Sequence, residues 1–118
     1  MTVESSTPPA NVYEAHGQLS VALPVPGAHP DNISVVVRPG RLQVLAECKY
    51  PQESQSYHRR EWMVGAWRLD LALPLHVDPA GARATLNFGV LVVMAPVARS
   101  APPGDAEARP VVAQAPSR

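Results

Sequence analysis

The stretch that most constrains the fold is ATLNFGVLVVMAP, residues Ala84–Pro96. It joins an alternating run, Arg83–Asn87, to a continuous apolar run, Val90–Ala95, across a glycine at position 89. Glycine accepts a positive φ without steric cost, so the sequence predicts a tight reversal there. Six apolar residues bounded by turn formers are too few for an independent helix and are typical of a strand buried on both faces. We therefore predict that Val90–Ala95 is the central strand of an all-β domain.

Short alternating segments recur along the rest of the chain, separated by proline and glycine turns. The predicted strands are a short edge strand at Val12–Ala15, then Gln18–Val25, Ile33–Val37, Arg41–Cys48 and Glu61–Leu73. This pattern predicts an immunoglobulin-like antiparallel β-sandwich over residues 12–97. Residues 1–11 are polar and are expected to form a short disordered arm, and residues 98–118 a flexible tail rich in proline and alanine.

Composition excludes several classes of partner. Ten basic and ten acidic residues cancel, and a neutral chain without a basic stripe argues against nucleic acid. No apolar run approaches the roughly 18 residues that a membrane-spanning helix needs, so no membrane partner is expected. Cys48 is the single cysteine, which rules out an internal disulfide and favours a reducing cytoplasm.

Candidate chemistry is sparse. The four histidines, His16, His29, His58 and His76, lack the close spacing of zinc ligands, and Cys48 is near none of them in sequence. A thiol at a strand end in apolar surroundings is usually inert. There is no glycine-rich phosphate loop and no G-x-S-x-G motif. We therefore predict no catalytic, cofactor or metal residues, and an enzyme that uses Cys48 or a histidine metal site is the weakest of the alternatives.

Several motifs taken together resemble the α-crystallin domain of the small heat-shock proteins. In order they are Pro26–Ile33, Gly40–Val44, Tyr57–Glu61, Gly65–Trp67 leading to Leu73-Pro74, and Ala84 leading to Gly89-Val90-Leu91. Their order and spacing match the family from Val12 to Pro96. Two positions depart from its pattern: Leu69 stands where an arginine is usual, with Arg68 one place early, and Phe88 stands where Asn or Asp commonly precedes Gly-Val-Leu.

The resemblance implies an ATP-independent chaperone, a holdase, which binds unfolding client proteins through exposed apolar surface and prevents their aggregation. A structural or adaptor sandwich without client activity, or a p23-like co-chaperone domain, is the alternative. The implied groove for clients and tails is lined by Val35, Val37, Ala84 and Leu86.

The resemblance also implies a homodimer, or a small higher oligomer, in which the loop Lys49–Arg60 reaches the partner's first strand. The implied interface residues are Val12, Tyr13, Tyr57, His58, Arg59 and Arg60. Members of the family carry a C-terminal Ile/Val-x-Ile/Val motif that binds a neighbour's groove, and its counterpart here is Val111 with Ala113. An alanine buries much less apolar surface than an isoleucine, so a large assembly locked by tails is not expected.

Overall fold

Alternation of apolar and polar residues produces strands with one buried face, and strands are the main secondary structure of the residues that the structure describes. The computed structural model describes residues 5–48, 56–59, 61, 65–98 and 109–114. Its elements are β1 (Ser5–Ser6), β2 (Asn11–Ala15), β3 (Gln18–Pro24), β4 (Ala28–Arg38), β5 (Arg41–Cys48), β6 (Ala66–Ala72), the 3₁₀ helix η1 (Pro79–Gly81), β7 (Arg83–Asn87), β8 (Val90–Pro96), β9 (Arg109–Val111) and β10 (Ala113–Gln114).

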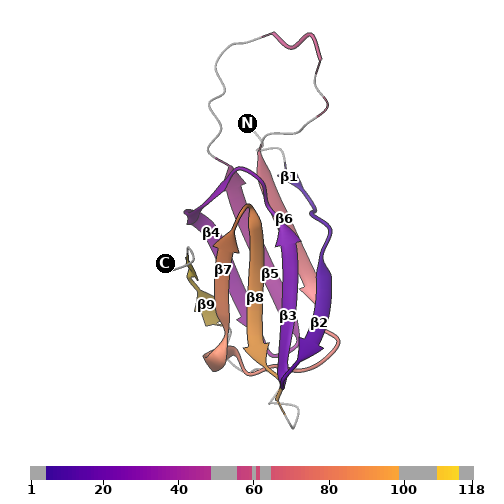
Figure 1. The fold of residues 1–118 in the computed structure, drawn as a ribbon, viewed down its shortest axis with the longest axis vertical. Coiled ribbons are helices and arrows are strands. Elements are labelled where there is room, and N and C mark those ends of the chain that lie inside the picture. The colour runs from indigo at the N-terminus through magenta and orange to yellow at the C-terminus, as the bar shows by residue number, and fades with distance from the viewer. Residues whose placement is uncertain (1–4, 49–55, 60, 62–64, 99–108, 115–118) are drawn as a thin grey trace.

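The strands form two sheets that pack face to face (Figure 1). One sheet has the order β1-β6-β5-β4-β9 and the other the order β10-β7-β8-β3-β2. Pairing is antiparallel except where β1 meets β6 and where β10 meets β7. The predicted all-β sandwich is confirmed.

Between the sheets lies one continuous core of inward-facing side chains. Its most deeply buried members are Leu23, Val25, Val35, Val37, Leu42, Val77 and Leu91. Leu69 also faces this core, whereas Arg68 is exposed on the other face of β6. The alternation of a strand therefore places the arginine of this chain on the outer face of its sheet.

The predicted central strand needs one correction. Strand β8 does lie in the middle of its sheet, between β7 and β3. Leu91, Val93 and Ala95 are buried, but Val92 and Met94 are only half-buried. The prediction of burial on both faces is wrong, because the sandwich has two layers and only one face of each sheet meets the other.

Two tight turns have the same backbone geometry. The predicted reversal between β7 and β8 is confirmed: Phe88 has φ 53° and Gly89 φ 79°, and they join the paired residues Asn87 and Val90. Between β2 and β3, His16 has φ 54° and Gly17 φ 76°. Two consecutive positive φ values in a two-residue hairpin loop identify type I′ turns, which match the twist of the strands they join.

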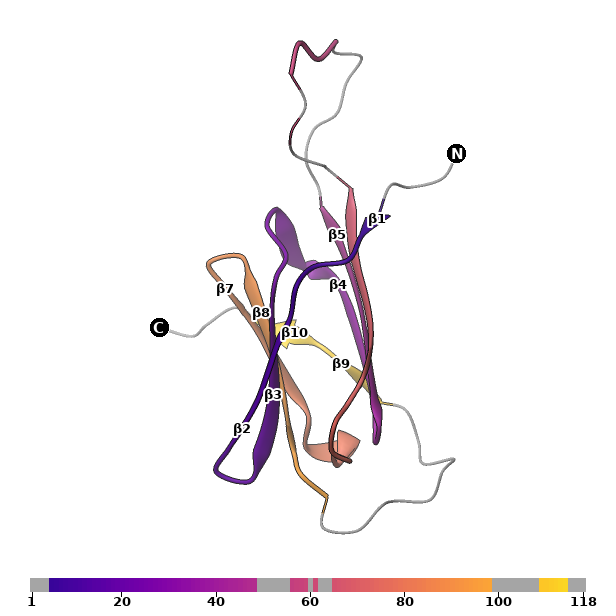
Figure 2. The same ribbon diagram turned by 90° about the vertical axis from the view of Figure 1, so that its right-hand side faces the viewer.

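The terminal segments contain strands that the sequence pattern did not indicate. Strand β1 lies within the predicted disordered arm, and β9 and β10 lie within the predicted flexible tail. Each terminal segment crosses from one sheet to the other, as Figure 2 shows. The edge strands β1, β9 and β10 therefore come from these segments, whereas the fourth edge strand, β2, matches the edge strand predicted at Val12–Ala15.

A polar contact ties one corner of the sandwich together. The carbonyl oxygen of Pro26, in the turn between β3 and β4, accepts hydrogen bonds from Trp67 Nε1 at 3.1 Å and from Cys48 Sγ at 3.3 Å. Trp67 is on β6 and Cys48 ends β5. Two of the sequence motifs thus share a structural role. The motif that begins at Pro26 and the motif that ends at Trp67 are joined by a hydrogen bond at this corner.

Candidate functional site: the seam between β4 and β7

The two sheets meet at an edge bounded by β4 on one side and β7 on the other, here called the seam. The four residues predicted to line a groove, Val35, Val37, Ala84 and Leu86, all point inward at this edge and are buried in the common core. Val35 and Val37 come from β4, and Ala84 and Leu86 come from β7. The four residues predicted from the sequence to line one groove therefore lie together at one edge of the sandwich.

The chain's own tail covers the seam. In β9, Val111 pairs with Val35 and Arg109 with Val37, in antiparallel register. In β10, Ala113 pairs with Ala84 in parallel register. The tail thus hydrogen-bonds to both sheets at once, and it occupies backbone groups of two strand edges that would otherwise be unpaired.

Side chains of the tail alternate as those of a strand do. Ala113 is 4% exposed and belongs to the core, and Val111 is half-buried against it. Val112, between them, is 77% exposed. The two residues that the sequence nominated as the tail motif are therefore the two that face inward, and they do so within a single chain.

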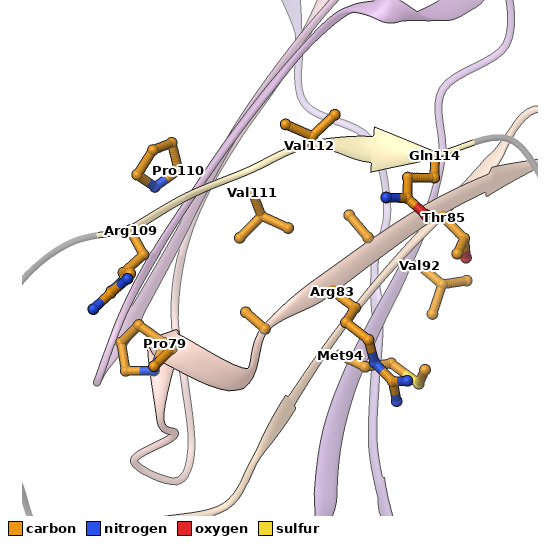
Figure 3. A pocket seen from close by; sticks show the side chains of 13 residues that line it. Pro79, Arg83, Thr85, Val92, Met94, Arg109, Pro110, Val111, Val112 and Gln114 are labelled. Carbon is orange, nitrogen blue, oxygen red and sulfur yellow. The ribbon is translucent and has the colours of Figure 1, made fainter.

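Beside the tail is a cavity of about 500 Å³, shown in Figure 3. It lies between the tail, η1 and the outer face of β7 and β8. Val92 and Met94 form part of its apolar floor, and Arg83, whose Nη2 is 3.4 Å from Gln18 Oε1, stands beside them. Because this side is open, the apolar packing of the tail against the core comes from Val111 and Ala113, and it adds to the ladder pairing of β9 and β10.

The predicted dimer residues lie in two separate places. All five residues of β2 are exposed, with Tyr13 at 48%, and among the described residues β2 pairs with β3 alone. Tyr57, His58 and Arg59 are exposed beyond the end of the sandwich where β6 begins, far from β2 (Figure 1). Arg59 donates to Glu61 Oε1 at 2.6 and 2.8 Å, and Arg60 lies outside the described residues.

The titratable groups do not form a reactive cluster in the described part of the chain. No group of three His, Cys, Asp or Glu side chains there could hold a metal ion. Burial raises the pKa of the Cys48 thiol, which donates to the carbonyl oxygen of Pro26. Arg41 Nε donates to Asp70 Oδ1 at 2.6 Å, and this bond lowers the pKa of Asp70 and raises the pKa of Arg41. Both members of this exposed pair lie on the outer face of their sheet.

Comparison with known proteins identifies the family. The model of the Hsp20/alpha crystallin family matches residues 11–112. The chain belongs to the Hsp20/alpha crystallin family. The resemblance drawn from the sequence motifs is therefore confirmed, and the matched range includes β9 of the tail.

Individual relatives agree with this assignment. A protein named Alpha-crystallin from Mycobacterium tuberculosis is 29% identical over 87 residues, which are 73% of this chain and 59% of that protein. The match thus spans about three fifths of the length of this curated relative. The solved structure of hspA from Xanthomonas axonopodis is 27% identical, with a TM-score of 0.69 over 82% of this chain and 98% of that one.

Heat shock protein 16.0 from Schizosaccharomyces pombe shares the fold, with a TM-score of 0.71 at 19% identity over 87% of this chain and 75% of that one. Among the residues that the structure describes, there is no helix long and apolar enough to cross a membrane.

Proposed function

We propose that this chain is an ATP-independent holdase that binds extended apolar segments of unfolding proteins at the seam. The observation that carries the proposal is the tail itself, which pairs with β4 and β7 and turns Val111 and Ala113 inward. Backbone pairing to a strand edge does not depend on the sequence of the added strand. The positions that Val111 and Ala113 occupy require only small or branched apolar side chains. A client segment with apolar residues at every second position meets both requirements.

In this proposal the tail competes with the client for the seam. While no client is bound, the tail protects the edges of β4 and β7 from pairing with another chain. A client gains access when the tail leaves, and its affinity is lowered by the small fraction of molecules in which the seam is open. The short tail therefore acts as a reversible cover of the client site.

A disulfide that locks the tail tests this mechanism. Val36 and Pro110 are ladder partners whose side chains lie on the outer face, away from the core. Antiparallel partners have Cα atoms about 4.5–5.5 Å apart, within the range that a disulfide spans. The variant Val36→Cys/Pro110→Cys, in a Cys48→Ala background, is assayed oxidised and reduced by light scattering of a heat-labile client without nucleotide.

We expect the reduced protein to suppress scattering at a near-stoichiometric ratio and the oxidised protein to lose most of this activity. The matched control is Asn11→Cys/Ala22→Cys, a ladder pair between β2 and β3 whose lock should have no effect. Equal suppression by the locked and unlocked tail would refute the seam as the client site. A wild-type chain that never suppresses scattering would refute the holdase function and leave the adaptor alternative.

We further propose a homodimer, or a small higher oligomer, in which Tyr57–Arg60 of one chain adds to the β2 edge near Val12 and Tyr13 of its partner. Support comes from the open outer edge of β2 and from the position of Tyr57, His58 and Arg59 beyond the sandwich. Such an exchange would cover an exposed strand edge in each chain. The single free thiol, Cys48, favours the reducing cytoplasm as the place of work.

Sedimentation velocity of this chain and of a variant lacking residues 54–60 tests the exchange. The expected result is a dimer that becomes a monomer on deletion. A full-length chain that sediments as a monomer at micromolar concentration would refute it.

A further inference from the structure

Phe88 combines two unfavourable features at one residue. It is the only phenylalanine of the chain, and it is 97% exposed at the tip of the β7–β8 hairpin. Its φ of 53° lies in the left-handed region, which a bulky side chain seldom adopts. The same position of a type I′ turn favours asparagine, which tolerates this conformation. Folding of the domain alone gives no reason for an aromatic residue here.

The two chain segments that meet at the Phe88 turn carry exposed apolar residues, and a hydrogen bond holds them together. Pro24 and Pro26 are exposed, and Val90, which is partly exposed, pairs with Pro24 in the ladder between β3 and β8. Val25 N donates to Gly89 O at 2.8 Å and so attaches the hairpin turn to the neighbouring loop. We call Pro24, Pro26, Phe88 and Val90 the Phe88 tip. No charged residue occurs in 24–28 or 87–90.

The size and charge of the Phe88 tip indicate its partner. One phenylalanine offers on the order of 200 Å² of surface, well below the roughly 800 Å² per partner of a stable protein interface. These two segments carry no basic side chain, so they themselves offer anionic lipid no electrostatic attraction. A small, rigid and uncharged aromatic contact suits a weak, transient encounter with a flexible apolar segment.

The position of the Phe88 tip agrees with such an encounter. Strand β10 pairs with β7 at Ala84 and Thr85 only. Leu86 and Asn87 continue toward the hairpin turn, and among the described residues neither has a ladder partner on that side. The tip therefore stands at the end of the seam that the tail leaves uncovered.

We propose that the Phe88 tip is a second contact for clients, an aromatic anchor for apolar segments of unfolding polypeptides that does not depend on release of the tail. This inference rests on the proposed holdase function. It assigns a binding role to the residue at which the chain departs from the turn sequence common in its family.

The substitution Phe88→Asn separates binding from stability. Asn-Gly is the preferred type I′ pair, so we expect the midpoint of thermal unfolding to rise by about 2–5 °C. Loss of the aromatic anchor should at the same time weaken binding of a permanently unfolded polypeptide, reduced and carboxymethylated α-lactalbumin, by about fivefold to tenfold. A variant that is more stable yet binds less cannot have lost activity by misfolding.

The chain supplies its own control in the turn between β2 and β3. His16 has nearly the same φ as Phe88, 54° against 53°, and also precedes a glycine. The β3–β8 register, which pairs Gln18 with Pro96 and Pro24 with Val90, puts the two turns at opposite ends of the sheet. His16→Asn should leave binding of the unfolded polypeptide unchanged. Sedimentation velocity of Phe88→Asn tests the remaining alternative, that the tip docks on a second copy of this chain.

The outcomes are distinct. Binding by Phe88→Asn equal to that of the wild type refutes the tip while leaving the holdase function intact. A fall in mass without a change in binding assigns the tip to self-association and also refutes it. A wild-type chain that does not bind the unfolded polypeptide refutes the holdase function, and the inference about the tip falls with it.

Discussion

Replacing Ala113 with aspartate should release the tail from the seam. The resulting loss in the free energy of unfolding cannot exceed the free energy with which the tail docks. The inward side chains of the tail are Ala113, fully buried, and Val111, half-buried. At about 0.8 kcal/mol per buried carbon group, they contribute about 0.8 and about 1.2 kcal/mol, or about 2 kcal/mol together. Burying an unpaired carboxylate costs several kcal/mol, so the folded chain gives up the tail instead. The ladder hydrogen bonds that the tail gives up add a modest net amount, so the loss of stability should level off at about 2–4 kcal/mol.

Urea unfolding followed by tryptophan fluorescence measures this loss, and thermal unfolding should show a midpoint lower by at least about 8 °C. Val112→Asp is the matched control, because it introduces the same charge at a neighbouring residue that is exposed. It should change stability by less than about 0.5 kcal/mol. A loss above about 4 kcal/mol for Ala113→Asp would mean that the tail belongs to the cooperative core.

A loss no greater than that of the Val112→Asp control would mean that the tail is not docked. A loss that depends on protein concentration would place the tail of one chain in the seam of another. Either result would contradict the reasoning from a tail that covers its own chain.

Three further changes test the packing and electrostatics of the sandwich. Gly81→Ala should lower stability by about 1–3 kcal/mol in urea unfolding, because a Cβ there would lie 2.7 and 2.9 Å from Cγ and Cδ of Pro96; an unchanged midpoint would show that the proline ring yields freely. Trp67→Phe removes the indole N–H that donates to Pro26 and should cost about 1 kcal/mol, measured in the same way. Asp70 has a pKa lowered by the arginine beside it, so the bond stabilises the fold above about pH 4 and is lost as pH falls through the lowered pKa. Comparing urea midpoints at pH 6 and pH 3 should therefore show a smaller acid loss for Asp70→Asn than for the wild type, and an equal loss would contradict the assignment.

The sandwich was accessible to sequence reasoning because its strands repeat one local rule. Apolar residues at every second position, as in Leu19, Val21 and Leu23, specify a strand and the face that it buries. The turn at Gly89 was predictable because glycine between two strand patterns favours a tight reversal, whereas the positive φ of Phe88 was not indicated by its residue type. The prediction that β8 is buried on both faces was wrong, because an apolar run does not reveal whether a third layer of structure is present.

Of the edge strands, β2 was predicted at Val12–Ala15, but β1, β9 and β10 were not. Strand β1 and strand β10 have two residues each, too few to display any periodicity. The sequence allowed Val35 and Ala84 to be predicted as residues of the seam. It did not allow us to predict that the chain's own tail would occupy the seam. A tail makes the same contacts whether it belongs to the same chain or to a neighbour, and local sequence does not distinguish the two.

The sandwich has two edges, each covered by a terminal segment of the chain. The two segments differ in how many contacts hold them to the sheets. At one edge, β2 pairs with β3 along five residues, and Pro8, in the crossing segment before it, is buried. At the other, β9 and β10 pair along three and two residues and bury one alanine and part of one valine. Segments with few buried contacts open at the lowest free energy in a folded protein. The fold therefore makes the seam between β4 and β7 the easier edge to open, and a segment that replaces the tail there has only about 2 kcal/mol of side-chain burial to match.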